Sequence, residues 1–386
     1  MFINFKMPSH LIPSPWPGRP ESLRRSNAYH QVAALALAAC ATATQASFAA
    51  SDGDLDTSAP PHFGYIDKTG RFVIKPIYDS ISPFSENCAI VKAGNELQVI
   101  DKTGKVLFKR DTGGALASVP GPYKEGLSLT NQGSDGYVNK SGTFVIAPKF
   151  QMARDFSEGY AAVATGEQPM TWSFIDKSGK VVIPGPFQMA LSFSQGLAPV
   201  MVDNKWGFID QTGKFVIAAK YAEVSSFADN LAAVQDLDEQ WHYIDRSGAP
   251  AFDGTFGLAT PFAEGTAFFG KKDSPDLTGC LDSHGKTVEL KDTIGVIPAG
   301  KCSNGLIPVK NKDKLFGFAN PTTGAIVIQP QFQGTFSFSD GLAAVCLNGK
   351  WGFMDPAGKL VVEPTFSEAD SFSEGLAGVG EASPSK

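Results

Sequence analysis

The sequence predicts an all-β protein built from tandem repeats of about 36 residues. Two signatures recur in phase along the chain, and no stretch of 3.6-residue apolar periodicity competes with them. The first signature ends in a turn glycine, whose copies lie at positions 70, 104, 142, 179, 213, 248, 285, 324 and 358. Nine copies therefore fill the chain from about residue 63 to its end.

The first signature predicts a strand, a tight turn and a second strand. Residues 206–210, Trp-Gly-Phe-Ile-Asp, are aromatic and β-branched, which is typical of a strand. Asp210 and Gly213 then predict the turn, because Asp accepts hydrogen bonds from nearby amides and glycine adopts positive φ. Asp355 and Gly358 repeat this turn in the ninth copy. The apolar residues 215–217 predict the next strand, and we expect the proline that follows in several copies to end it.

The second signature reads Phe-Ser-Glu-Gly or a close variant, and an apolar strand such as Leu-Ala-Ala-Val follows it. Each unit is therefore expected to form a three-stranded meander. Aromatic burial is the largest stabilising contribution that such a small unit has. We therefore expect the repeat core to contain Trp172, Trp206, Trp241, Trp351, Phe156, Phe193, Phe227, Phe338 and Phe372.

One unit is too small to bury its aromatic face alone, so neighbouring units must stack. We expect an open superhelical array, because nine units with irregular spacing are many for a ring. The alternative is a closed, propeller-like ring. The repeat begins at residue 63 without a preceding Leu-Ala-Ala-Val strand and ends on such a strand at residues 376–379. The last strand could therefore complete the first unit.

Residues 1–50 differ from the rest and predict a signal peptide with a leader. A basic flank that includes Arg24 and Arg25 precedes an alanine-rich apolar run, which is too short to span a membrane. Cleavage after Ala49 would leave the chain free, whereas the lipobox-like residues 37–40 would make Cys40 an acylated first residue. Residues 51–62 are expected to be a linker and residues 63–386 the nine-copy domain. We expect an exported protein, in the periplasm, at the outer membrane if lipidated, or outside the cell.

Both signatures together resemble those of the bacterial WG-containing repeat family. That family's unit runs Trp-Gly-Phe-Ile-Asp, turn, apolar strand and then Phe-Ser-Glu-Gly-Leu-Ala, and the resemblance covers residues 63–379. It implies an exported or surface β-repeat protein and little specific chemistry. The chain departs from the pattern in the second copy, at residues 97–100, and in the seventh, at residues 278–281, where the tryptophan is missing.

The residues themselves offer no catalytic or metal-binding constellation. His-Glu-x-x-His and Gly-x-Ser-x-Gly do not occur, and each turn supplies one Asp where calcium needs several converging oxygens. The formal charge of −6 argues against a nucleic-acid partner. We therefore expect a protein that is not an enzyme, needs no cofactor or metal, and meets a membrane only through a lipid on Cys40.

Two cysteines replace core aromatics in the seventh copy. Cys280 stands at the Phe position of Trp-Gly-Phe, and Cys302 stands at the Phe position of Phe-Ser-Glu-Gly. We predict a disulfide between them that substitutes for the missing aromatic contact. The alternative is a pair of buried free thiols, since Cys is common in protein cores.

The sequence therefore predicts a scaffold of the bacterial envelope that binds a protein or a glycan. Contacts are expected at the loops that vary most between copies, because insertions gather on one face of repeat proteins. These loops are residues 109–123, 164–171 and 271–278. Two alternatives remain open: a ligand-binding protein or enzyme with a site in the central channel of a closed ring, and a purely structural spacer.

Overall fold

The computed structural model describes residues 62–111, 121–166, 169–272, 277–290, 295–296 and 302–381, all within the larger of two units into which the chain divides. The predicted signal peptide, most of the linker and Cys40 lie outside the described residues. The described residues form strands and turns without a helix. No membrane-crossing helix of sufficient length and apolarity occurs in this part of the chain.

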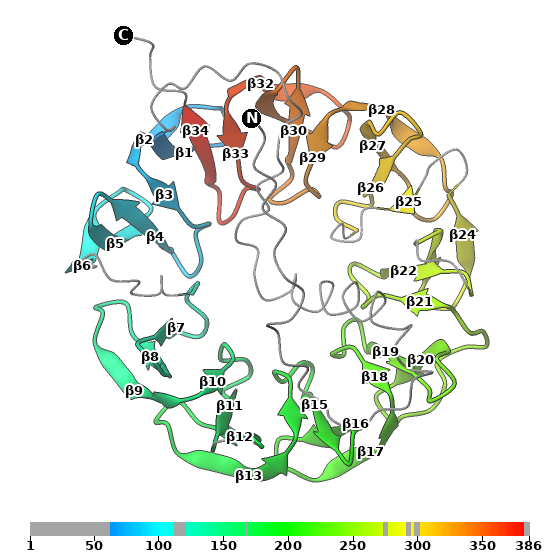
Figure 1. Ribbon diagram of the computed structural model, residues 1–386. Coiled ribbons are helices and arrows are strands. Elements are labelled where there is room, and N and C mark those ends of the chain that lie inside the picture. The colour runs from blue at the N-terminus through cyan, green and yellow to red at the C-terminus, as the bar shows by residue number, and fades with distance from the viewer. Residues whose placement is uncertain are drawn as a thin grey trace, which may run out of the picture. The chain divides into compact units, whose positions relative to one another are not determined.

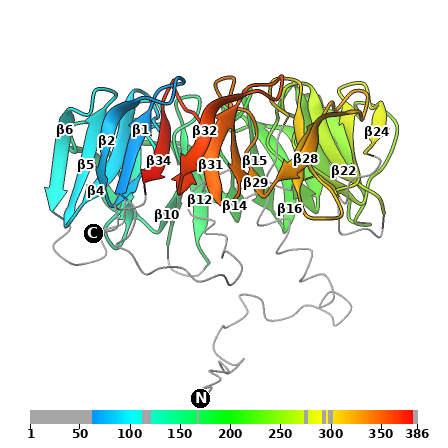
Figure 2. The same cartoon turned by 90° about the horizontal axis from the view of Figure 1, so that it is seen from above.

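Nine small antiparallel sheets form a closed ring, a β-propeller (Figure 1; Figure 2 shows the ring from its edge). We number the sheets 1 to 9 in the chain order of their Trp-Gly strands. Within each sheet the strands are given from the centre of the ring outward. Sheet 1 contains β33 (Glu368–Ala369), β34 (Ala377–Glu381), β1 (His62–Ile66) and β2 (Phe72–Tyr78).

The next four sheets follow in chain order. Sheet 2 contains β3 (Ser80–Ile81), β4 (Cys88–Ala93), β5 (Glu96–Asp101) and β6 (Val106–Asp111). Sheet 3 contains β7 (Ser128–Asn131), β8 (Asp135–Val138) and β9 (Phe144–Phe150). Sheet 4 contains β10 (Met152–Ala153), β11 (Ala161–Thr165), β12 (Thr171–Ile175) and β13 (Val181–Phe187). Sheet 5 contains β14 (Met189–Ala190), β15 (Leu197–Val202), β16 (Lys205–Asp210) and β17 (Phe215–Tyr221).

The last four sheets complete the ring. Sheet 6 contains β18 (Glu223–Val224), β19 (Leu231–Gln235) and β20 (Trp241–Asp245). Sheet 7 contains β21 (Leu258–Ala259), β22 (Thr266–Gly270), β23 (Gly279–Asp282) and β24 (Thr287–Glu289). Sheet 8 contains β25 (Gly295–Val296), β26 (Ile307–Lys310), β27 (Phe316–Ala319) and β28 (Ile326–Phe332). Sheet 9 contains β29 (Gly334–Thr335), β30 (Ala343–Leu347), β31 (Lys350–Met354) and β32 (Leu360–Phe366).

The three-stranded meander expected for each repeat is present, and most sheets add a two-residue strand on the channel side. The outermost strand is longer than expected. The prediction that proline ends it is wrong, because β2, β9, β28 and β32 continue through Pro76, Pro148, Pro330 and Pro364. The strand is at the open edge of its sheet, where a residue without an N–H is tolerated.

A bulge accompanies the proline and explains the glycine of Trp-Gly. Trp206 pairs with Tyr221 and Phe208 with Ile217, so four steps along the outer strand face two steps along β16. The bulged backbone presses against Gly207, where a Cβ would lie 2.6 Å from the Ile217 carbonyl oxygen. Glycine leaves room for this close approach, whereas sheet 4 keeps the bulge with Ser173 at this position and Gly185 on the outer strand.

The chain closes the ring by pairing its last strand with its first. β34 lies antiparallel to β1, from His62 opposite Glu381 to Ile66 opposite Ala377. The expected open superhelix is therefore wrong, and the propeller-like alternative is correct (Figure 1). Closure lets sheet 1 take a full set of strands and leaves no end sheet with an uncovered apolar face.

The core lies between neighbouring sheets. Most turn glycines of one sheet pack on an aliphatic side chain of the preceding outer strand: a Cβ at Gly104 would lie 3.3 Å from Ile74. At Gly142 and Gly285 the neighbour is instead a phenylalanine, Phe108 or Phe252. The same contact closes the ring, since a Cβ at Gly70 would lie 3.0 Å from Val362. Sheets 9 and 1 are thus packed like any other neighbouring pair.

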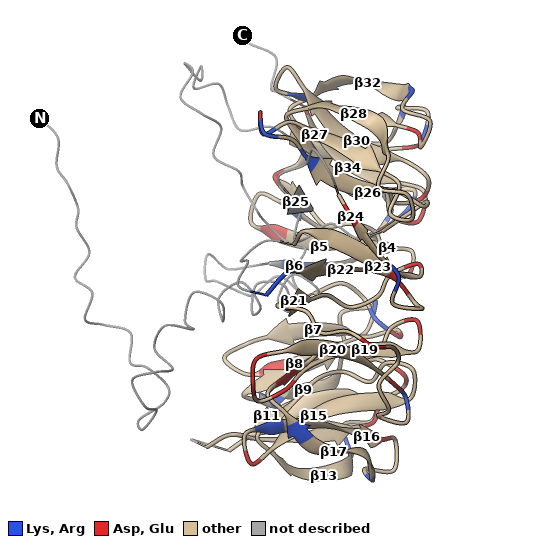
Figure 3. Ribbon diagram, turned by 90° about the vertical axis from the view of Figure 1, so that its right-hand side faces the viewer, with Lys and Arg blue, Asp and Glu red and all other residues tan. Residues whose placement is uncertain are grey.

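Strand direction gives the ring two different faces. One face, which we call the turn face, carries the Asp-x-x-Gly turns and the Phe-Ser-Glu-Gly turns. The opposite face, which we call the hairpin face, carries the hairpins between the Leu-Ala-Ala-Val and Trp-Gly strands, such as residues 203–204. Many Lys, Arg, Asp and Glu residues lie in loops along the right-hand side of the ring in Figure 3.

Candidate functional site

Hydrogen bonds on the turn face join neighbouring sheets through the serine of Phe-Ser-Glu-Gly. Ser157 Oγ donates to the carbonyl oxygen of Phe193 in the next sheet at 2.8 Å. Ser194 Oγ donates in the same way to the Phe227 carbonyl at 2.6 Å. Ser85 and Ser373 make the same type of bond, to the carbonyl oxygens of Tyr123 and Phe84, so in these four turns the serine ties its sheet to an aromatic residue of the following sheet.

The acidic residue of the same signature makes a second link to the following sheet. Glu158 accepts a hydrogen bond from the Gly196 amide at 2.9 Å, and Asp340 accepts one from the Gly375 amide at 2.7 Å. Turn lysines add ion pairs, for example Lys177 with Glu125 at 3.1 Å. These side chains satisfy one another within the ring, so the turn face has a structural role. We call this set of contacts the inter-sheet belt.

The turn aspartates direct their oxygens into their own loops. Asp210 Oδ1 accepts hydrogen bonds from the Thr212 amide at 2.9 Å, the Thr212 hydroxyl at 2.6 Å and the Lys214 amide at 3.1 Å. The Thr212 hydroxyl is the main reason why the pKa of Asp210 is lowered. Asp355 accepts from two amides in the same way, and Gly213 and Gly358 have positive φ. Within the described residues, no three His, Cys, Asp or Glu side chains converge on a point that could hold a metal ion.

The expected core aromatics lie between the sheets. Trp172, Trp206 and Trp241 are buried, whereas Trp351 is half-buried and stacks on Phe336 at 5.4 Å. The five phenylalanines named for the second signature are each at most 3% exposed: Phe156, Phe193, Phe227, Phe338 and Phe372. Edge-to-face contacts join the two signatures, as between Phe208 and Phe227 at 4.9 Å.

The two cysteines of the seventh copy lie in one core cluster, which Leu277 and Ile307 share. Burial raises the pKa of the Cys280 thiol to about 12, and Cys302 contributes to the shift. All four described cysteines are buried free thiols, so the structure contains no bridge between Cys280 and Cys302. Their oxidation to a disulfide stays a prediction.

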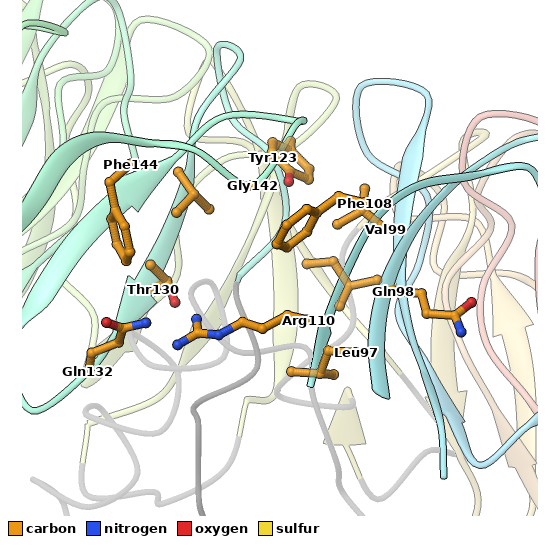
Figure 4. A pocket seen from close by; sticks show the side chains of 12 residues that line it. Leu97, Gln98, Val99, Phe108, Arg110, Tyr123, Thr130, Gln132, Gly142 and Phe144 are labelled. Carbon is orange, nitrogen blue, oxygen red and sulfur yellow. The ribbon is translucent and has the colours of Figure 1, made fainter. Parts of the chain in front are cut away.

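Sheets 2 and 3 enclose a cavity of about 220 Å³, which we call the seam cavity (Figure 4). It arises where the second copy departs from the repeat. Gln98 replaces the glycine of Trp-Gly. β6 runs without the bulge at this point, and Arg110 pairs with Leu97 where most other sheets place an aromatic residue. The aromatic that would fill the seam is replaced by a long, charged side chain.

The walls of the seam cavity are mostly apolar, and its polar groups lie together. Phe108 and Phe144 face each other across it, and Leu97 and Val99 line its side on sheet 2 (Figure 4). In Figure 4 the Arg110 guanidinium points toward Gln132. The Thr130 hydroxyl points toward the same region. The bounds of β6 and β7 place this polar end at the hairpin face.

Gln132 and Thr130 differ in their hydrogen bonds: among the described residues, one has a partner and the other has none. With its amide oxygen turned toward the guanidinium, Gln132 accepts hydrogen bonds from Arg110 Nη1 at 2.9 Å and from Arg110 Nη2. Thr130 is 2% exposed, and its Oγ1 has no hydrogen-bond partner in the described part of the chain. A buried hydroxyl without a partner loses free energy, so this group is available to a ligand.

Sequence reasoning pointed to this region without naming the site. It singled out residues 97–100 as a departure and residues 109–123 as a contact loop. It did not single out Arg110 or Thr130. The sequence did contain a signal. When the copies are aligned by repeat, Gln98 and Arg110 stand where most other copies have a glycine and an aromatic residue.

Comparison with solved structures finds proteins of similar outline at low identity. The computationally designed Ika8 protein is 14% identical, with a TM-score of 0.48, over 78% of this chain and 98% of that chain. BamB from Moraxella catarrhalis is 11% identical, with a TM-score of 0.38, over 78% and 96%. A structure titled eukaryotic initiation factor is 11% identical, with a TM-score of 0.43, over 81% and 87%. No protein with a curated description matches the chain.

The family comparison agrees with the repeat phase. The family described as WG containing repeat matches residues 63–96, 136–167, 172–206, 206–241, 316–351 and 351–381. These segments cover more than half of the chain and lie in sheets whose strands and turns carry both signatures. The chain belongs to the WG containing repeat family.

Proposed function

We propose that this propeller is a non-enzymatic, exported scaffold that binds a protein partner through its hairpin face. The proposal rests on a difference between the two faces: the signature side chains that join neighbouring sheets lie on the turn face. On the turn face, the Ser, acidic and Lys side chains of the signatures are used in the inter-sheet belt. The repeated side-chain contacts of the hairpin face lie within single sheets, as between Gln188 and the Asn204 amide and between Gln333 and the Gly349 amide, both at 2.7 Å. Most residues of this face are therefore not needed to join neighbouring sheets and can vary with a ligand.

The variable loops support the same face. Residues 164–171 connect β11 to β12, and residues 271–278 connect β22 to β23, so both loops join strands at the hairpin face. β6 also ends there, at Asp111, within the third variable loop of residues 109–123. Leu237, in the hairpin between β19 and β20, is 64% exposed. Variable surface loops on a rigid scaffold are where binding residues concentrate.

Site-directed photo-crosslinking tests the proposed face. A photoreactive residue would replace Thr165 or Lys272 on the hairpin face, with the turn-face residue Ala357 as the matched control; all three positions are exposed. In envelope extract, the hairpin-face positions should give a discrete protein adduct and position 357 should give none. Equal adducts from both faces, or adducts only from position 357, would contradict the proposal.

The exported state and the class of partner need separate measurements. The mass of the N-terminal peptide from cells would distinguish a chain starting at Ala50 from one starting at an acylated Cys40, and retention of residues 1–39 would contradict export. A glycan partner, the alternative class, would give no protein adduct but saturable binding to a glycan array.

A further inference from the structure

We propose that the seam cavity binds a small organic carboxylate that carries one aromatic ring or a similarly compact apolar group. Arg110 and Thr130 would hold the carboxylate, and Phe108 and Phe144 would enclose the apolar part. If the carboxylate is the C-terminus of a partner protein, the inference rests on the proposed function. If it belongs to a free organic acid, the inference is independent of that function, because the acid would bind in the same cavity.

The size of the seam cavity limits its ligand. Its volume is about 220 Å³. An apolar protein cavity of roughly 150 Å³ accepts benzene, so this one accommodates a single ring together with a carboxylate. Pockets for drug-sized molecules start at about 300 Å³, which excludes larger ligands such as nucleotides.

The positive charge of Arg110 at the polar end of the seam cavity favours a negatively charged ligand. Arg110 forms no ion pair within the described residues, whereas its neighbour Lys109 pairs with Glu96 at 2.9 Å. Gln132 accepts from Nη1 and Nη2 of Arg110, which leaves Nε–H and the outward N–H groups of the five-donor guanidinium for a second acceptor. A planar guanidinium matches a carboxylate with two parallel hydrogen bonds.

The Thr130 hydroxyl is a second and independent indication of a ligand. It is buried, lines the seam cavity and lacks a partner in the described part of the chain. A carboxylate oxygen accepts from Arg110 and from a hydroxyl at the same time, so one ligand group satisfies both side chains. Phe108 and Phe144 then offer the ring faces that favour offset or edge-to-face contact with an aromatic ligand.

Phenylacetate is the probe that tests this inference, with the neutral phenylacetamide as its matched control. Binding would be followed by calorimetry and by ligand-observed NMR on the full repeat domain. We expect saturable one-to-one binding of phenylacetate and at least about tenfold weaker binding of the amide, because charge-assisted hydrogen bonds are lost. No saturable binding of phenylacetate up to about 10 mM would overturn the inference, because binding weaker than this is not specific recognition.

Three variants identify the residues. Arg110→Gln should weaken phenylacetate binding by about tenfold or more, and Thr130→Val should weaken it by about three- to tenfold. Lys109→Gln removes a positive charge from the same strand outside the seam cavity, and it should change binding less than about twofold. Equal effects of Arg110→Gln and Lys109→Gln would show nonspecific attraction and overturn the assignment. Circular dichroism would check that each variant is folded, and Thr130→Val, which keeps the side-chain shape, tests the assignment independently of Arg110.

The source of the carboxylate is tested with peptides. A short peptide ending in phenylalanine with a free carboxylate would be compared with the same peptide carrying a C-terminal amide. Tighter binding of the free peptide than of phenylacetate supports a partner's chain end, and exclusive binding of phenylacetate supports a free acid. Carboxylate binding without a photo-crosslinked partner would refute the proposed function alone. A crosslinked partner without carboxylate binding would refute this inference alone.

Discussion

Ser373 Oγ donates a hydrogen bond of 2.7 Å to the carbonyl oxygen of Phe84, a residue 289 positions earlier in the chain. The bond has the same form as that between Ser157 and Phe193 in consecutive repeats. The belt therefore continues across the point where the two ends of the repeat domain meet. The ring is held there by the same contacts that join its other sheets.

Removal of the closing strand should destabilise the whole ring. A chain that ends at Gly375 lacks the buried Leu376 and all of β34, including the buried Val379, and uncovers one side of β1. Burial of each such side chain contributes roughly 1.5–3 kcal/mol, so we expect a loss of more than about 3 kcal/mol in the free energy of unfolding. Urea unfolding followed by circular dichroism measures this loss. A chain that ends at Glu381 is the control and should unfold like the full domain; equal midpoints for both truncations would show that the ring does not depend on β34.

Serine-to-alanine substitutions test whether the belt is continuous. Ser373→Ala removes the hydrogen bond across the closure, and Ser194→Ala removes the equivalent bond between sheets 5 and 6. Each should lower the free energy of unfolding by about 1 kcal/mol, the usual net value of a hydrogen bond. Thermal unfolding of the two variants should therefore shift by similar amounts. A shift for Ser194→Ala with none for Ser373→Ala is the result expected of an open array.

Asp370 should make the stability of the ring depend on pH. Burial, assisted by Glu368, raises the pKa of Asp370 from 3.8 to about 6. The folded protein therefore holds this proton more tightly than the unfolded chain does, and the stability contributed by Asp370 is present below pH 4 and lost as pH rises through 6. Asp370→Asn should raise the free energy of unfolding above pH 6, by up to about 3 kcal/mol, and have little effect at pH 4.

Unfolding midpoints of Asp370→Asn measured between pH 4 and pH 8 check this dependence. Glu363→Gln, which changes an exposed carboxylate in β32, is the matched control. An equal effect of Asp370→Asn at both ends of the pH range would contradict the role of the buried carboxyl.

The cysteine pair should oxidise during folding and resist oxidation afterwards. Burial raises the pKa of Cys280 to about 12 and also raises the pKa of Cys302, so little thiolate is present in the folded protein at neutral pH. Refolding with oxidised glutathione should give a Cys280–Cys302 bridge, whereas the folded, reduced domain should react slowly with the same reagent. Mass mapping of unreduced peptides identifies the bridge, with Cys88 and Cys346 as internal comparisons. Complete alkylation of Cys280 and Cys302 in exported protein would reject the predicted disulfide.

Some features of the ring follow from local residue chemistry and were therefore readable in the sequence. The Asp210–Gly213 turn depends on four consecutive residues, and the burial of Phe227 depends on a signature that recurs at a fixed phase. Other local expectations failed because the deciding contact comes from a neighbouring strand. Pro330 interrupts no strand, since β28 lies at an open edge and bulges beside Gly317.

The seam cavity likewise combines a feature that was visible in the sequence with one that depends on tertiary packing. The sequence marked residues 97–100 as unusual, but it did not show that Arg110 and Thr130, on different sheets, share one cavity. That proximity depends on how β6 packs against β7 and β9.

By itself, the sequence determined the repeat, its two signatures and the all-β class, because hydrophobic alternation and turn chemistry act over a few residues. Only the tertiary structure decided between an array and a ring. The curvature that brings residue 379 beside residue 64 is the sum of small rotations between neighbouring sheets, and no single repeat encodes that sum.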